Sequence, residues 1–244
     1  MHRRTFLQTL ATAATPLLAP RAVFASDAAV VVEPKELEGV LVNPGLGLET
    51  FNRFNRSGPK AQSANFGPKA PPANYPVCSI AYFRLWWQEL EPKQGAFNFD
   101  RIESLLKQAR AEGQDLALRF MPWFPMQELQ TPEWFKRQAA HFFRCRFRQW
   151  QEPQRGLTEQ DYWAPDFNDA WFLDRAAALV QAFGEKFDGH PDLAYLDIGS
   201  VGNWGEWHTS NTVPPVPMLT EDNARRIVDA YFRHWSRTPL VFNL

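Results

Sequence analysis

The sequence predicts an α/β fold of the (β/α)8-barrel type, with about the first five strands present. Short, continuous apolar runs alternate along the chain with amphipathic helical patterns, which is typical of a parallel sheet. No glycine-rich phosphate-binding motif follows the first apolar run, which disfavours a doubly wound sheet that binds nucleotides. Polar and aromatic residues gather just after each predicted strand, and in a barrel these strand ends form the active face.

The N-terminal segment predicts export rather than a part of the fold. Arg3 and Arg4 are followed by a weakly apolar stretch and by the small-residue pattern Val23-Phe24-Ala25, as in a twin-arginine signal peptide. The apolar stretch is too short for a stable membrane anchor. We therefore expect a signal peptide over residues 1–25, a linker over 26–38, and a barrel domain over 39–244 that works in a bacterial periplasm or outside the cell.

The elements of the barrel domain follow from apolar periodicity and from helix-capping residues. The predicted strands lie within residues 39–51, where a Gly/Pro-rich loop follows the strand, and within 77–87, 115–123, 193–199 and 239–244. The predicted helices lie within residues 98–113, 131–147, 169–190 and 220–237. Asp100, Thr131 with Pro132, and Thr220 are the expected helix starts.

Composition limits the classes of function. The 244 residues carry a formal net charge of −1, which gives no electrostatic reason to expect a nucleic acid or an anionic membrane as partner. The chain has 10 tryptophans, and we expect at least two of them to line a ligand site, where an indole can stack on a sugar ring. The five histidines are scattered and the two cysteines, Cys78 and Cys145, form no CxxC motif, so we expect no metal and no cofactor. The cysteine spacing leaves a disulfide open.

The predicted strand ends supply the candidate site. Glu206 lies between two tryptophans after the fourth strand, and apolar rings beside a carboxyl raise its pKa, as a general acid near neutral pH requires. A glutamate at the rim, paired with His208 or with an arginine, is the alternative. Arg84 and Arg119 each follow an apolar run, where a guanidinium fixes either a substrate hydroxyl or a neighbouring carboxylate. The other candidates for substrate binding are Trp86, Trp87, Trp123, Asn203, Trp204, Trp207 and His208. Asn43, Glu49 and Asn243 also fall at the expected strand ends.

Two runs of sequence carry a family resemblance. "RLWWQELEPKQGAFNFDRIESLLKQARAEGQDLALRFMPW" and "WAPDFNDAWFLDRAAALVQAFGEKFDGHPDLAYLDIGSVGNWGEWH" resemble the clan of retaining glycoside hydrolases with (β/α)8 barrels, in particular its beta-galactosidase-like members. The resemblance implies hydrolysis of glycosides and makes Glu206, by position, the acid/base at the end of the fourth strand. The clan usually has Asn before this glutamate, where this sequence has Gly205.

The resemblance also implies a nucleophilic glutamate after a seventh strand, whereas this sequence holds five strands. We therefore expect the chain to be the N-terminal part of a longer enzyme and to be inactive alone. A half-barrel completed by another copy or by another chain is the alternative architecture. The alternative function is an exported carbohydrate-binding barrel without catalysis. The sequence leaves the sugar, the linkage, endo or exo action and the oligomeric state open.

Overall fold

The computed structural model describes Gly45 and residues 48–56, 76–124, 131–138, 142–149 and 156–242. The chain divides into two compact units, Met1–Val40 and Leu41–Leu244, and every described residue belongs to the second. The predicted signal peptide and linker, as well as Asn43 and Asn243, lie outside the described residues. Within the described ranges, no helix is both long and apolar enough to cross a membrane.

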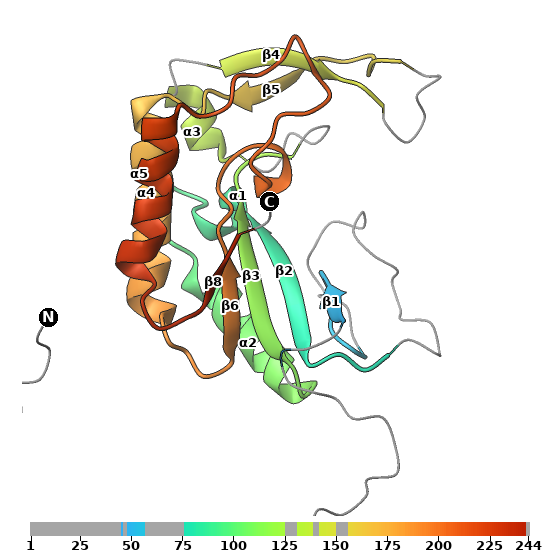
Figure 1. The fold of residues 1–244 in the computed structure, drawn as a ribbon, viewed down its shortest axis with the longest axis vertical. Coiled ribbons are helices and arrows are strands. Elements are labelled where there is room, and N and C mark those ends of the chain that lie inside the picture. The colour runs from blue at the N-terminus through green and yellow to red at the C-terminus, as the bar shows by residue number, and fades with distance from the viewer. Residues whose placement is uncertain are drawn as a thin grey trace, which may run out of the picture. The chain divides into compact units, whose positions relative to one another are not determined.

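The core of the fold is a sheet of five parallel strands (Figure 1). Its strands are β1 (Glu49–Phe51), β2 (Ile80–Trp86), β3 (Asp115–Met121), β6 (Leu193–Asp197) and β8 (Leu240–Val241). They lie side by side in the order in which they occur in the chain, with every neighbouring pair parallel. A doubly wound sheet reverses its strand order at a switch point, whereas a barrel does not. The sheet is therefore of the barrel type, as predicted.

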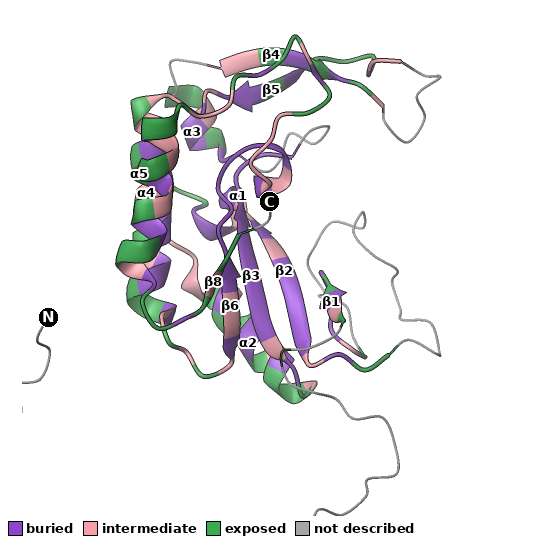
Figure 2. Cartoon of the chain, viewed as in Figure 1, coloured by how far each residue is buried: buried purple, intermediate pink, exposed green. Residues whose placement is uncertain are grey.

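Helices pack against one face of this sheet. They include α2 (Phe99–Ala111), α4 (Ala170–Phe187) and α5 (Glu221–His234), with the one-turn α1 (Trp87–Leu90) directly after β2. On β2 the side chains of Ala81, Phe83 and Leu85 are fully buried in the main hydrophobic core that these helices share. Figure 2 shows the buried stripe along β2, β3 and β6. Since strand side chains alternate between faces, the intervening residues of these strands form a second, inner face.

Helices α4 and α5 run side by side (Figure 1). Asp169 caps α4 by accepting hydrogen bonds from the backbone N–H groups of Trp171 and Phe172. Thr220 caps α5, as predicted, by accepting from the Asn223 N–H. A Cβ at Gly184 would lie 2.5 Å from the carbonyl oxygen of His234, so only glycine permits this close approach of the two helices.

The segment 131–147 differs from its prediction as a single helix. The helix α3 covers only Glu133–Gln138, and Phe142–Phe147 forms the strand β4. β4 pairs antiparallel with β5 (Tyr162–Pro165) and with β7 (Thr212–Val213) in a separate three-stranded sheet. Cys145 and Phe147 are buried while Arg144 and Arg146 are exposed. This two-residue alternation is the period of a strand, and it overrides the helical pattern that begins at Thr131.

Candidate active site

The inner face of the parallel sheet carries charged and aromatic side chains in layers. Register places Arg84 on β2 beside Arg119 on β3, and Arg119 beside Asp197 on β6. One layer earlier, Phe51 on β1 lies beside Tyr82 on β2. These side chains line a cavity of about 360 Å³, whose full lining is Glu49, Phe51, Tyr82, Arg84, Arg119, Tyr195, Asp197, Val241 and Phe242.

Arg119 is held by a buried carboxylate. Its Nε donates to Oδ2 of Asp197 over 2.8 Å, and a second guanidinium nitrogen pairs with the same oxygen. The Tyr82 hydroxyl donates to this oxygen as well, over 2.8 Å. Burial raises the pKa of Tyr82 above its ordinary range, so this hydroxyl remains a donor. The guanidinium of Arg119 therefore has a fixed orientation, with its remaining nitrogen directed toward the loop after β6.

The loop after β6 places Glu206 at the carboxyl edge of the sheet. Between residues 200 and 211, six residues have positive φ: Ser200, Gly202, Trp204, Gly205, Trp207 and Asn211. A Cβ on Gly205, whose φ is +71°, would lie 2.9 Å from the carbonyl oxygen of Phe120, so this position favours glycine. Backbone strain of this kind is costly, and it concentrates at functional sites.

Two arginines and a histidine contact the Glu206 carboxylate. Oε1 lies 2.7 Å from an Arg84 guanidinium nitrogen and 3.3 Å from Nη1 of Arg119, and Oε2 lies 3.3 Å from Nε2 of His208. Burial raises the pKa of Glu206, but Arg84, His208 and Arg119 together hold it below its ordinary value. The expectation of a raised pKa is therefore wrong for the ligand-free protein. The apolar rings are adjacent to Glu206 in sequence, but the groups that touch its carboxylate are cationic or imidazole nitrogens.

The rest of the loop is held by hydrogen bonds within the site. The Asn203 side chain donates to the carbonyl oxygen of Ser210 over 2.9 Å. The Trp207 indole donates to the carbonyl oxygen of Ile198 over 2.8 Å. The backbone N–H of Trp204 donates to the carbonyl oxygen of Trp123 over 3.1 Å. Asn203 and Trp207 thus support the shape of the loop that carries Glu206.

The three-stranded sheet fastens this loop from its other end. β7 begins six positions after Glu206, and its residues Thr212 and Val213 pair with Phe147 and Arg146 of β4. The ring of Phe147 also meets the Trp204 ring edge-on, with centroids 6.1 Å apart. The insertion between β3 and β6 therefore forms part of the support of the candidate site.

The structure brings together Arg84, Arg119, Glu206 and His208. Asn203, Trp204 and Trp207 belong to the loop that carries Glu206, but neither these three residues nor Glu206 and His208 are among the residues that line the cavity. It places Trp87 elsewhere, in a buried aromatic cluster with Trp134 and Phe135. Trp123 is also buried and packs against Phe167. Trp86 ends β2 and is partly exposed, but it does not line the cavity.

Glu49 begins β1 instead of following a strand, so it does not lie at the predicted carboxyl edge. It accepts a short hydrogen bond from the Tyr195 hydroxyl in the lower layer of the inner face. Both cysteines are buried free thiols.

Sequence reasoning missed Tyr82, Tyr195 and Asp197 as site residues. Tyr82 precedes Arg84 by two positions, and Tyr195 precedes Asp197 by two. Side chains two apart on a strand share a face, so the strand period places each pair on one side of the sheet. The sequence marks the ends of the predicted strands as candidates, whereas these residues lie within the strands.

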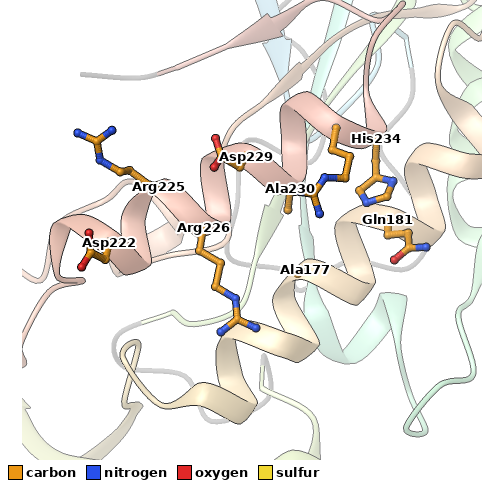
Figure 3. A pocket seen from close by; sticks show the side chains of 9 residues that line it. Ala177, Gln181, Asp222, Arg225, Arg226, Asp229, Ala230 and His234 are labelled. Carbon is orange, nitrogen blue, oxygen red and sulfur yellow. The ribbon is translucent and has the colours of Figure 1, made fainter.

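A second cavity, of about 400 Å³, lies between α4 and α5 (Figure 3). Its charged side chains include Arg225 and Arg226, which pair with Glu221 and Asp174 on the same two helices. Exposed pairs of this kind contribute little energy and are screened by salt. The cavity is on the helical side of the sheet, apart from Glu206. We therefore place the candidate active site at the inner face. In the described part of the chain, no group of three His, Cys, Asp or Glu side chains could hold a metal ion.

Comparison with known proteins finds similarity in solved structures alone, since no family model and no curated protein matches the sequence. One similar structure is GH5_18 from Streptomyces cattleya in complex with GlcNAc, at 13% identity and a TM-score of 0.44, covering 68% of this chain and 35% of that one. Endo-glycoceramidase II from Rhodococcus sp. has 12% identity and a TM-score of 0.44, with 68% and 41% covered. A beta-galactosidase from Rahnella sp. has 15% identity and a TM-score of 0.36, with 49% and 16% covered. The chain thus spans less than half the length of these proteins.

Proposed function

We propose that this protein is an exported glycoside hydrolase in which Glu206 is the acid/base residue. The observation that carries the proposal is the strained loop that holds the Glu206 carboxylate against Arg84 and Arg119, two arginines from adjacent strands that line the inner cavity. A carboxylate fixed by charged groups at the carboxyl edge of a barrel-type sheet is placed where such folds carry out their chemistry.

The cavity offers groups that suit a polyhydroxylated ligand. Aromatic rings of Phe51, Tyr82 and Tyr195 lie along one side of it. Oδ1 of Asp197 is buried and has no hydrogen-bond partner among the described residues. A buried acceptor without a donor is costly, and a sugar hydroxyl supplies that donor once a shift of the Asp197 side chain exposes Oδ1 to the cavity.

The lowered pKa of Glu206 determines which half of the reaction the ligand-free site is ready for. The ionised carboxylate can act as a base and take a proton from the attacking water. To act as an acid on the leaving oxygen, Glu206 must first take up a proton. Among the groups that lower the pKa of Glu206, Arg84 has the largest effect. A substrate that displaces Arg84 from Oε1 therefore raises this pKa and favours proton uptake. The second carboxylate of a retaining mechanism is assigned to no residue of this sequence.

The test is Glu206→Gln in a form of the protein that hydrolyses an aryl glycoside. Substrates with poor leaving groups should lose about 10²–10⁴-fold in rate, because the amide cannot protonate the leaving oxygen. With an activated aryl glycoside, the rate at which the glycosyl enzyme forms should fall far less. Added azide should then react with the glycosyl enzyme and yield a glycosyl azide of retained configuration. Glu221→Gln, an exposed residue on α5, is the matched control and should leave both rates unchanged. Equal losses on both substrates without an azide product would refute the assignment.

A carbohydrate-binding barrel without catalysis is the second candidate. The observation that favours it is the pairing of Glu206 with two arginines, which stabilises a permanent carboxylate rather than an acid. Such a protein would bind oligosaccharides with an affinity that Glu206→Gln alters, yet would hydrolyse no aryl glycoside. Turnover that disappears in Glu206→Gln excludes it.

A further inference from the structure

The outer face of the three-stranded sheet carries a row of exposed cationic side chains. On β4, Arg144 and Arg146 are exposed and alternate with buried Cys145 and Phe147. Arg148, exposed as well, continues the alternation just beyond the strand, where it bridges to Leu157. Alternate residues of an antiparallel strand lie about 7 Å apart on one face. We call Arg144, Arg146, Arg148, Asp161 and Trp163 the arginine–tryptophan face.

Trp163 is an exposed indole held in place by its neighbours. It lies directly opposite Arg144 in the pairing of β4 and β5, and 46% of its surface is exposed. The Arg144 guanidinium carbon lies 4.8 Å from the ring centroid, and the Phe142 ring meets the indole edge-on at 6.2 Å. A large aromatic side chain that is both exposed and fixed is suited to stack on a ligand, since little rotamer freedom remains to be lost.

The charges on this face do not cancel. Asp161 is the acidic member of the face, and it pairs with Arg146 over 3.1 Å and with Arg144 over 4.0 Å. Arg144, Arg146 and Arg148 supply three guanidinium groups, while Asp161 and Glu159, which is exposed two positions before it, supply two carboxylates. The cations therefore outnumber the acids by three to two. A concentration of one sign on one face attracts a ligand of the opposite sign.

The arginine–tryptophan face is coupled to the candidate active site. Arg146 pairs with Val213 of β7, and the backbone N–H of Arg148 donates to the carbonyl oxygen of Asn211 over 2.7 Å. Both partners belong to the segment that follows Glu206. A polymer bound along this face would therefore lie on the three-stranded sheet, whose strand β7 follows the loop that carries Glu206.

We propose that the arginine–tryptophan face binds a carbohydrate polymer that carries carboxylates, with a sugar ring on Trp163 and its acidic groups on the arginines. The choice of a carbohydrate rests on the proposed function, and the choice of an acidic one rests on the charge of this face. A single-stranded nucleic acid fits less well. Such strands need several aromatic platforms for successive bases, whereas this face has one exposed indole.

The test measures binding of the 244-residue chain to two cellulose derivatives with the same backbone. Carboxymethylcellulose is acidic and hydroxyethylcellulose is neutral, and the dissociation constants come from titration calorimetry and affinity electrophoresis. The wild-type chain should bind the acidic polymer at least about tenfold more tightly, and salt should reduce the difference. Trp163→Ala should weaken binding of the acidic polymer about tenfold, and the pair Arg144→Gln with Arg146→Gln should abolish the preference for it.

Two variants on α5 serve as matched controls. Phe232→Ala removes an exposed aromatic ring and Arg225→Gln an exposed arginine, and neither should change binding more than about twofold. Circular dichroism verifies the fold of each variant. Failure of the wild-type chain to bind carboxymethylcellulose, or equal losses in the Trp163 and α5 variants, overturns the inference. So does tighter binding of oligothymidylate than of the acidic polymer. The variants on this face leave Glu206, Arg84 and Arg119 intact. A failure of the binding test is therefore distinguished from a failure of the proposed catalysis, which the turnover of Glu206→Gln tests.

Discussion

Glu91 provides the sharpest test of how the site-bearing sheet is stabilised. It is one of the glutamates close in sequence to β2, yet its side chain is fully buried on the helical side. Its carboxylate accepts hydrogen bonds from the Trp87 indole N–H over 2.8 Å and from the Gly95 backbone N–H over 2.7 Å. It also forms a short ion pair with Arg175 of α4. One carboxylate thus joins α1, the turn after it and α4, which makes it a structural and not a catalytic group.

The perturbation is Glu91→Gln, which keeps the shape but replaces one acceptor oxygen by an amide NH₂. If the remaining oxygen faces Gly95 and Arg175, the new NH₂ group meets the Trp87 indole donor and leaves it without an acceptor. Removing one partner of a buried ion pair costs about 3–5 kcal/mol. An orphaned donor alone accounts for about 1–3 kcal/mol. Because Arg175 retains 17% side-chain exposure and can be hydrated, we expect a loss of about 3 kcal/mol in the free energy of unfolding.

The assay is urea unfolding monitored by circular dichroism. The free energies of unfolding of wild type and variant are compared with one shared m-value, the slope of that free energy against urea concentration. Glu221→Gln is the control, since Glu221 forms an exposed pair with Arg225 one helical turn away. It should cost less than about 0.5 kcal/mol. A loss below about 1 kcal/mol for Glu91→Gln would show that water or a rearranged Arg175 replaces the buried pair, and would refute the reasoning.

Three further predictions concern export, electrostatics and acid stability. Replacing Arg3 and Arg4 by lysine should leave the precursor in the cytoplasm, as cell fractionation would detect, and normal export would contradict the twin-arginine assignment. Arg84→Met should raise the pKa of Glu206, seen as a carboxyl ¹³C titration at higher pH than in wild type, since it removes the largest lowering charge; an unchanged titration would exclude the ion pair. Burial raises the pKa of Asp188, but three backbone N–H donors and a hydroxyl outweigh it and bring the pKa below its ordinary value. Its stabilisation is thus present above the unfolded pKa of about 4 and lost as pH falls toward the folded one. Asp188→Asn should therefore be less stable than wild type at pH 6, with the gap closing toward pH 2, and a gap independent of pH would argue against this.

The regular elements were predictable because their sequence period is strong. The helices α2, α4 and α5 fall inside the predicted ranges, since each has a wide apolar stripe and a polar opposite face. The parallel strands were also predicted, although β1 occupies Glu49–Phe51, where a loop was expected. The sequential order of the strands followed from the absence of a nucleotide-binding motif and from the residues at the strand ends.

The features that the sequence did not predict depend on contacts between distant residues. For the residues of β4 the sequence predicts a helix, because the helical pattern that begins at Thr131 continues into the segment where Arg144 and Arg146 alternate with buried residues. The pKa of Glu206 was expected to rise because the adjacent tryptophans are visible in sequence. The arginines that lower it come from strands whose register only the structure shows. The local sequence pattern thus indicates Glu206 as a candidate, whereas contacts with residues distant in sequence set the pKa of its carboxyl group.

The layer of Arg84, Arg119 and Asp197 also bears on how the chain finds its strand pairing. Parallel strands that are apolar on both sides can slide past one another at little cost, because every register buries similar side chains. Here a slip of one residue would turn a guanidinium away from its carboxylate and into the apolar core beside α4, where an unpaired charge is costly. The same ionic layer that positions Glu206 therefore acts, during folding, against misaligned pairings of β2, β3 and β6.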